Sequence, residues 1–190
     1  MIIEGSFTVN APLEETWNFL IDFERMSVCM PGVEDVVREE NGDTYTGKVT
    51  VKVGPIATSF QGKVIKTDEE APRLLKAKLQ GRDAKTASMV TGEFSSELSE
   101  PEAGKTEVAY KFDIAIRGRL GQFGQAVILD TSRQLTDEFV ACVRKRVEQP
   151  DAPPESAAPQ ANLFFVALRA FFTSLWTNIK SVFSPKKENA

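Results

Sequence analysis

The sequence has no histidine among its 190 residues and only two cysteines. Without an imidazole, the chain cannot carry a Ser-His-Asp or Cys-His catalytic arrangement, or a zinc or iron site that needs histidine ligands. The cysteines, Cys29 and Cys142, form no C-x-x-C pair, so they suggest neither a metal knuckle nor a disulfide scaffold. We therefore expect both thiols to be reduced and buried, and we expect no metal site, no covalent cofactor and no catalytic residues.

Charge of neither sign dominates the chain, whose formal net charge is −4. Residues 1–149 hold 19 Lys and Arg against 24 Asp and Glu, whereas residues 161–190 hold four cations against one anion. The mildly acidic body argues against nucleic acid as the main partner, and the basic end points to an anionic surface. The first ten residues lack the basic region and apolar core of a signal peptide, so we expect the body to be cytoplasmic.

The stretch 121–147 has the spacing of one long helix of about seven turns. Its apolar residues recur at three- and four-residue steps, which predicts one buried face. Gly121 and Gly124 mark its start, and Pro150 follows its end. The buried face is formed by Phe123, Val127, Ile128, Leu135, Phe139, Val143 and Val147.

This apolar face has a gap at Thr131 and Ser132, which are small and polar where a packed core favours leucine or isoleucine. One interpretation is that their hydroxyls bond to neighbouring strands. The other is that a hollow lies beside the helix. The pattern by itself leaves both open.

The residues before this helix predict an antiparallel sheet and two short helices. Alternation from Ile3 to Val9 predicts a first strand, a short helix follows Pro12, and a second runs from about Phe23 to Cys29. Turn signals then separate six strand-like runs, which predict a meander wrapped around the long helix. These runs lie near residues 33–40, 43–54, 57–69, 72–82, 86–99 and 105–118.

Five of these runs carry a glycine on the face that also carries their apolar residues. Glycine in a strand costs about 0.5–1 kcal/mol relative to alanine, so its repeated use on the buried face needs a reason. One reason is curvature, because a strongly bent sheet uses glycine at kinks and bulges. The other is that missing side chains leave volume for an apolar guest. The glycines are Gly47, Gly62, Gly81, Gly92 and Gly118.

The order of these elements resembles the helix-grip fold of the START-like, or SRPBCC, superfamily. More narrowly, residues 1 to about 148 resemble the CoxG family, which is associated with carbon monoxide dehydrogenase. The resemblance is carried by C-M-P-G-V-E at 29–34, Y-T-G-K-V-T-V-K-V-G-P at 45–55, F-Q-G-K-V at 60–64 and G-R-L-G-Q-F-G at 118–124.

The resemblance implies an α+β fold in which a curved, seven-stranded antiparallel sheet wraps around a long C-terminal helix. Residues 1–149 would form this domain, with a hydrophobic cavity between the sheet and the helix. It also implies a role in bringing a molybdenum-containing CO dehydrogenase to the cytoplasmic membrane, so that the electrons of the enzyme reach the quinone pool.

The remaining residues predict a tether and an amphipathic helix. Residues 150–161 are rich in proline and predict an extended linker, and residues 185–190 form a basic end. Residues 162–184 divide into an apolar and a polar face, which favours a helix lying on the membrane surface over one that spans it. Docking on a partner protein and packing on its own domain are the alternatives. The membrane-binding residues we predict are Phe164, Phe165, Leu168, Phe171, Phe172, Leu175, Trp176, Ile179, Val182, Phe183, Lys186 and Lys187.

From the hollow and the electron path that the resemblance implies, we expect a non-enzymatic accessory protein on the cytoplasmic face of the membrane. It would bind an isoprenoid quinone, menaquinone or ubiquinone, and present it to the dehydrogenase. The cavity-lining residues we predict are Trp17, Met26, Met30, Val51, Val53, Phe60, Met89, Phe94, Phe123, Ile128, Leu135 and Phe139.

Two other classes of function remain open. One is a recruitment adaptor with a filled core and no ligand. The other is a small START-like enzyme acting on an apolar substrate, which would need an ionisable group such as Asp83 or Asp113 in the cavity. Arg82 and the run 117–119 lie at predicted strand ends, where they would orient a polar head group at the cavity mouth.

Overall fold

The computed structural model describes residues 1–149, and the structural statements below concern this part of the chain. The linker, the amphipathic segment and the basic end predicted for residues 150–190 lie outside the described residues, and so do all twelve predicted membrane-binding side chains.

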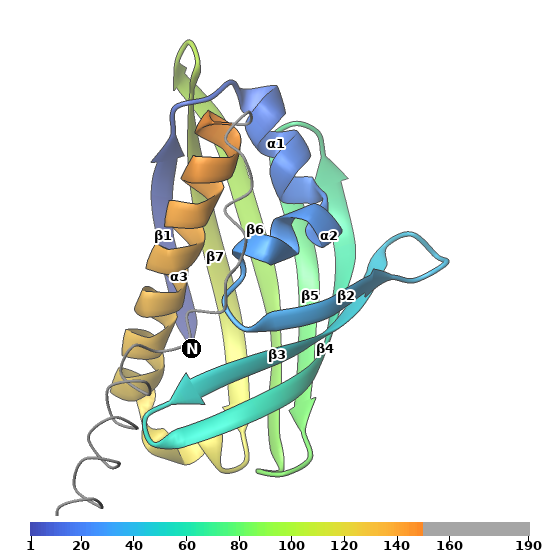
Figure 1. The fold of residues 1–190 in the computed structure, drawn as a ribbon, viewed down its shortest axis with the longest axis vertical. Coiled ribbons are helices and arrows are strands. Elements are labelled where there is room, and N and C mark those ends of the chain that lie inside the picture. Colours follow the sequence, from blue (N-terminus) through green and yellow to red (C-terminus); the bar gives the residue numbers. More distant parts are fainter. Residues whose placement is uncertain (150–190) are drawn as a thin grey trace, which may run out of the picture. The chain divides into compact units, whose positions relative to one another are not determined.

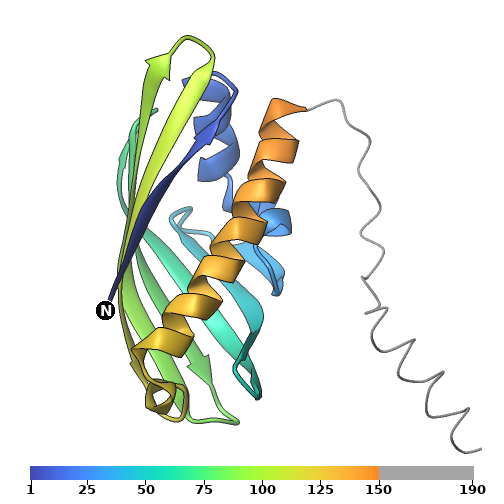
Figure 2. The same cartoon turned by 90° about the vertical axis from the view of Figure 1, so that its left-hand side faces the viewer.

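The described residues form one seven-stranded antiparallel sheet with the helices on one of its faces (Figures 1 and 2). Strands β2 to β7 follow one another as a meander, and β1 joins the far edge by pairing with β7. The predicted meander is therefore confirmed. The strands are β1 (Ile2–Val9), β2 (Val33–Arg38), β3 (Thr44–Val53), β4 (Ile56–Glu70), β5 (Leu74–Asp83), β6 (Ser88–Glu102) and β7 (Lys105–Arg117).

The two short helices are α1 (Leu13–Ile21) and α2 (Phe23–Met26), and a 3₁₀ turn, η1 (Ser27–Cys29), continues α2. Pro12 precedes α1, where its fixed φ suits a helix start. The carboxylate of Asp22 accepts a hydrogen bond from the Arg25 N–H at 3.0 Å and caps α2. Both helices lie where the sequence predicts them.

The long helix, α3 (Gln125–Glu148), begins later than predicted. Gly124 has a φ of +79°, a left-handed conformation that interrupts a right-handed helix, and residues Leu120–Phe123 form a separate 3₁₀ turn, η2. The prediction of one continuous helix from residue 121 is therefore wrong at its start. Figure 2 shows α3 running along the concave side of the curved sheet.

The last turns of α3 are fixed to the beginning of the chain. Val143 and Val147 pack with Val9 in one buried cluster. Around them, the Glu148 carboxylate accepts a hydrogen bond from the backbone N–H of Asn10 at 2.8 Å. This end of the helix is therefore rigidly placed against β1.

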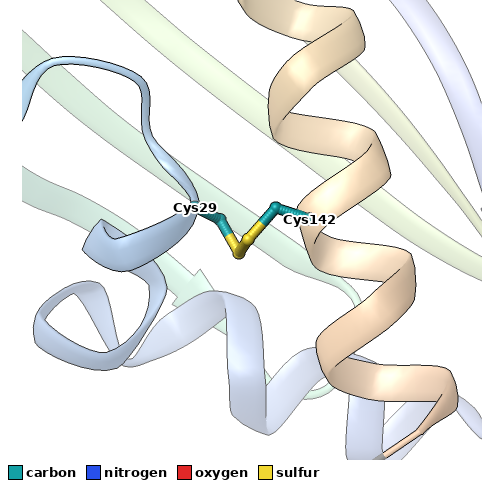
Figure 3. Close-up of a disulfide and its surroundings, with 2 residues drawn as sticks. All are labelled: Cys29 and Cys142. Carbon is teal, nitrogen blue, oxygen red and sulfur yellow. A yellow bond between two sulfur atoms is a disulfide. The ribbon is translucent and has the colours of Figure 1, made fainter. Parts of the chain in front are cut away.

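A disulfide joins Cys29 of η1 to Cys142 of α3, with the two Cα atoms 5.3 Å apart (Figure 3). The prediction that both thiols are reduced is wrong for this structure, although Cys29 is buried as expected. The two cysteines are 113 residues apart. Their pairing depends on how the fold brings η1 against α3, and the local spacing rules used for cysteine do not detect such a contact.

Candidate functional site

A cavity of about 360 Å³ lies between the concave face of the sheet and the helices. Its lining comprises 26 residues from all seven strands, the two short helices, η1 and the loop after it, and α3. None of these residues has a charged side chain, and most are Val, Leu, Met or Phe. A concave, apolar space of this size is typical of a small-molecule site.

The side of the cavity opposite the sheet is built from two segments. Met26 and Met30 come from the region of α2 and η1, and Leu135 and Phe139 come from α3. The disulfide at Cys29 links these two segments covalently, as Figure 3 shows. Met30 lines the cavity and is also 40% exposed, so it lies between the cavity and the surface of the protein.

The glycines form part of the opposite wall. Gly47, Gly62 and Gly81 are neighbours across β3, β4 and β5, and Gly47 and Gly62 line the cavity. A Cβ at Gly62 would make only ordinary contacts, the nearest at 3.5 Å, so backbone crowding does not require glycine there. Gly62 therefore leaves space, whereas a Cβ at Gly47 would lie 3.3 Å from the carbonyl oxygen of Glu34 on β2. Gly81 instead lies under the ring of Phe60.

The close approach of neighbouring backbone explains the other two glycines. A Cβ at Gly92 would lie 2.5 Å from the carbonyl oxygen of Asp113 on the next strand. Gly118 has a φ of +79°, and a Cβ there would meet the backbone of Ala87. Backbone approach and a positive φ therefore require glycine at these two positions, whereas neither requires it at Gly62.

Aromatic rings gather on the part of the cavity formed by β1, β6 and β7. The Phe94 and Phe112 ring centroids are 4.6 Å apart, and Tyr110 lies 6.1 Å from Phe112 and 6.5 Å from Phe7. Phe139 of α3 meets Phe7 edge to face at 6.3 Å. All five residues line the cavity, so a planar guest would meet ring surfaces on several sides.

The hydroxyl gap in α3 has an explanation that neither earlier interpretation gives. The Thr131 hydroxyl donates to the carbonyl of Val127 at 2.9 Å, and the Ser132 hydroxyl donates to that of Ile128 at 2.8 Å. Both groups are thus satisfied within the helix itself, and neither lines the cavity. The hollow lies about one turn further on, beside Leu135 and Thr136.

Six of the twelve residues predicted to line the cavity do so, and six lie elsewhere. The lining members are Met26, Met30, Val51, Phe94, Leu135 and Phe139. Whether these residues bind a ligand stays a prediction.

The other six residues occupy the packed core or its margins. Trp17 packs in the buried cluster with Leu13, and Val53, Phe60 and Phe123 form another cluster with Leu120. Ile128 is buried on α3, and Met89 lies at the start of β6, opposite Arg117. The lining prediction is wrong for these six, because their side chains pack outside the cavity lining.

Several cavity residues were not predicted from the sequence, although strand alternation identifies them. Phe7 shares a face with Val9, and Tyr110 and Phe112 share a face with Val108, so period-two counting places them inside. The residues of β2 could not be found this way, because the strand contains an irregularity between Glu34 and Val37 that shifts its register.

The candidate acidic and basic residues lie outside the cavity lining. Asp83 is buried and accepts hydrogen bonds from the hydroxyls of Thr58 and Thr86 and from the Lys85 N–H, and these bonds lower the pKa of its carboxyl group. Asp113 is exposed, 3.7 Å from the N-terminal amine. The prediction that arginines orient a ligand at the mouth is also wrong, since Arg82, Arg117 and Arg119 are exposed and outside the lining.

Two further features bear on the class of protein. Within residues 1–149, no three histidine, cysteine or acidic side chains come together as a group that could hold a metal ion. None of the helices in the same part of the chain has the length and apolar character needed to cross a membrane.

Several solved structures have the same architecture, and each matches this chain over nearly the whole of its own length. A conserved protein from Geobacillus kaustophilus is 19% identical with a TM-score of 0.72, covering 78% of this chain and 95% of the other. A START superfamily protein from Mycobacterium smegmatis is 13% identical with a TM-score of 0.59, covering 78% and 98%. The Zhui aromatase/cyclase from a Streptomyces species is 15% identical with a TM-score of 0.57, covering 80% and 99%.

These likenesses confirm the START-like fold, and at such identities they carry no information about ligand or activity. No curated protein matches the sequence significantly. Residues 5–148, however, match the family model that describes CoxG, a subunit of carbon monoxide dehydrogenase. The match includes the motifs at 29–34, 45–55, 60–64 and 118–124, so the chain belongs to the CoxG family.

Proposed function

We propose that this chain is a peripheral membrane accessory protein of a molybdenum-containing CO dehydrogenase, and that it carries an isoprenoid quinone such as menaquinone in its cavity. The observation that carries the proposal is the cavity of about 360 Å³ without a charged side chain. Such a lining favours an apolar guest, because a charged one would be desolvated without a partner. Membership of the CoxG family supports the dehydrogenase as the partner.

The size of the cavity limits how much of the quinone it holds. A protein cavity of about 150 Å³ takes up one benzene molecule. A cavity of about 360 Å³ therefore suits a two-ring quinone and the first carbons of its chain. The rest of the isoprenoid chain would leave beside the exposed side chain of Met30.

The predicted amphipathic segment at 162–184 would hold the protein on the cytoplasmic face of the membrane. Its aromatic and aliphatic face would lie among the lipid chains, and the lysines at 186 and 187 would meet anionic head groups. From that position the protein would bring the dehydrogenase to the membrane and pass its electrons to the quinone pool.

The cavity supports a carrier better than the two other classes. A recruitment adaptor without a ligand has no use for an open apolar space, which forfeits packing contacts. An enzyme working by acid–base catalysis needs a titratable group at the substrate, and among residues 1–149 the only titratable side chains in the lining are those of Tyr45 and Tyr110.

Extraction mass spectrometry tests the proposal. Full-length protein is purified from its native host without detergent, and bound lipids are extracted and quantified against protein. We expect a quinone at close to one molecule per chain, and none in a mock purification from a host lacking the protein. If the purified protein carries no stoichiometric lipid, quinone carriage is contradicted and the recruitment adaptor is the function that remains.

A second experiment tests recruitment separately. Purified dehydrogenase is mixed with anionic vesicles, with or without the full-length protein, and the vesicles are floated. We expect the dehydrogenase to float only when the protein is present. Flotation that does not depend on the protein would contradict the recruitment role without affecting quinone carriage.

A further inference from the structure

Two hydroxyl groups lie on the sheet wall of the cavity, one on β6 and the other over β1, on the far side of β7. Ser96 on β6 is the cross-strand partner of Tyr110 on β7, and both residues line the cavity. Ser96 is only 6% exposed. Within residues 1–149, neither hydroxyl has a hydrogen-bond partner in the protein.

Such a hydroxyl is unusual in this molecule, because most buried polar groups are hydrogen-bonded. The other buried Ser and Thr residues in the described part of the chain all have partners, with the exception of Thr16. Thr106, for example, donates to the carbonyl of Ala11 at 2.8 Å. The Thr16 hydroxyl is fully sealed and lies outside the cavity lining, whereas Ser96 belongs to that lining.

Tyr110 is held in place by its neighbours. Gly5 lies opposite it on β1, and a Cβ at Gly5 would come within 2.7 Å of the Tyr110 Oη atom. Glycine at this position therefore makes room for the end of the phenol. Phe7 and Phe112 flank the ring, so the hydroxyl has a fixed place before any guest arrives.

The cavity wall has an aromatic region around Ser96 and Tyr110 and an aliphatic region on other strands. Ser96 lies between Tyr110 and Leu75 along the sheet, and Leu75 and Val108 are among the most buried lining residues. The aromatic rings of β1, β6 and β7 gather here. The wall formed by β2, β3 and β4 is mostly aliphatic, with Val33, Val36, Val49, Val51 and Val64.

We propose that Ser96 and Tyr110 form a polar subsite whose two hydroxyls, one on each side of β7, donate hydrogen bonds to the two carbonyl oxygens of a planar quinone ring. The ring packs against Phe94 and Phe112, and the chain of the guest runs along the valine wall toward Met30. The guest thus binds with its ring at the buried end. This inference rests on the proposed function and adds the orientation of the guest and the residues that select for a quinone.

Equilibrium dialysis of the full-length protein with two compounds tests the subsite. One is 2,3-dimethyl-1,4-naphthoquinone, whose methyl groups block reaction with thiols, and the other is 2,3-dimethylnaphthalene, which has the same rings without carbonyls. We expect Ser96→Ala and Tyr110→Phe each to weaken quinone binding about 3- to 10-fold, the worth of one hydrogen bond. Binding of the hydrocarbon should change less than about twofold.

The matched control is Ser95→Ala. Ser95 is the neighbouring residue on β6, and strand alternation places its side chain on the opposite face of the sheet, so both compounds should bind as they do to the wild type. Thermal unfolding of each variant checks that the fold is intact.

The possible outcomes separate the subsite from the proposed function. The subsite would be overturned if the variants lost binding of both compounds equally, or if they lost no quinone binding. It would also be overturned if Tyr45→Phe, and not Tyr110→Phe, weakened quinone binding selectively. In these cases the carrier role stands because the wild type still binds both rings. If the wild type binds neither compound, the proposed function and the subsite fail together.

Discussion

Gly62 on β4 lies directly opposite Gly47 on β3, and both residues face the cavity. Two adjacent strands thus omit their side chains at the same level of the sheet. Because a Cβ at Gly62 would meet nothing closer than 3.5 Å, the backbone does not force glycine there, and its absence of a side chain preserves space.

Filling this space should remove ligand binding and keep the fold. In Gly62→Val, the new side chain fits the strand backbone and projects into the cavity, so we expect quinone occupancy to fall at least tenfold. The melting temperature should change by only a few degrees. Lipid extraction and thermal unfolding measure the two effects.

Two substitutions serve as controls for the filled cavity. Gln61→Val, on the exposed face beside Gly62, should leave occupancy unchanged. Gly92→Ala should lower stability because its Cβ would meet a backbone oxygen at 2.5 Å. Full occupancy in Gly62→Val would show that the guest binds elsewhere.

Reducing the Cys29–Cys142 disulfide should destabilise the protein. A cross-link that closes a loop of this length restricts the unfolded chain and contributes about 2–5 kcal/mol. We expect urea unfolding in the presence of dithiothreitol to show a free energy of unfolding that is lower by that amount. The double variant Cys29→Ser/Cys142→Ser should unfold identically with and without reductant.

The redox state of the cysteines in the native host is a separate question, because the cytoplasm normally keeps thiols reduced. Rapid alkylation of cells before lysis, followed by mass spectrometry, counts the free thiols. We expect none in the full-length protein. Two alkylated cysteines per chain would contradict the disulfide and restore the prediction made from the sequence.

Asp83→Asn should destabilise the protein at neutral pH and have little effect in acid. Hydrogen bonds from Thr58 and Thr86 hold the pKa of the Asp83 carboxyl below the ordinary value of about 3.9. The stabilisation is therefore complete above pH 4 and is lost as the pH falls through the lowered pKa. We expect the melting temperature of the variant to be several degrees below wild type at pH 7, with the difference shrinking below pH 4.

Asp113→Asn is the comparison for this pH series. Its carboxylate is exposed and lies 3.7 Å from the N-terminal amine, so its removal should change the melting temperature by about one degree or less. A pH-independent deficit in Asp83→Asn would mean that the ionised form of Asp83 does not supply the stabilisation.

Deleting residues 162–190 should release the protein from membranes. Flotation with vesicles containing anionic lipid should recover the full-length chain at the top of the gradient and leave the truncated chain at the bottom. Phe172→Asp in the full-length chain should weaken binding strongly, whereas Asn178→Asp, on the predicted polar face, should weaken it only slightly. Equal flotation of the truncated chain would contradict the membrane-binding prediction.

Periodicity predicted most of this fold because its signals are local. The alternation in strands such as β7 and the three- and four-residue steps of α3 are set by which face of each element is buried. The same reasoning predicted the hollow from the glycines and named Gly47 and Gly62, which do line it. It misplaced the start of α3 because the four-residue step from Phe123 to Val127 continues the apolar spacing across Gly124. The backbone of Gly124 is left-handed, so the helix begins only after it.

The details of the cavity needed the tertiary structure. Phe60 shares a face with Gly62, yet its ring turns over Gly81 and fills that part of the space. Ser96 resembles any other strand serine in the sequence, and its missing partner becomes evident only when its neighbours are known. The contact between Cys29 and Cys142 arises from the docking of η1 on α3, which no short-range pattern encodes.

The disulfide also determines how the chain would respond to mechanical force. Tension applied between the two ends of the chain passes through the disulfide from Cys29 to Cys142. It therefore bypasses the residues between these cysteines, which are 113 positions apart in the sequence. Strands β2 to β7 lie within this covalent ring, so roughly 400 Å of contour length cannot be extended while the bond is intact. A pull between the two ends of the chain would extend only the residues outside this ring, which include β1, α1 and α2.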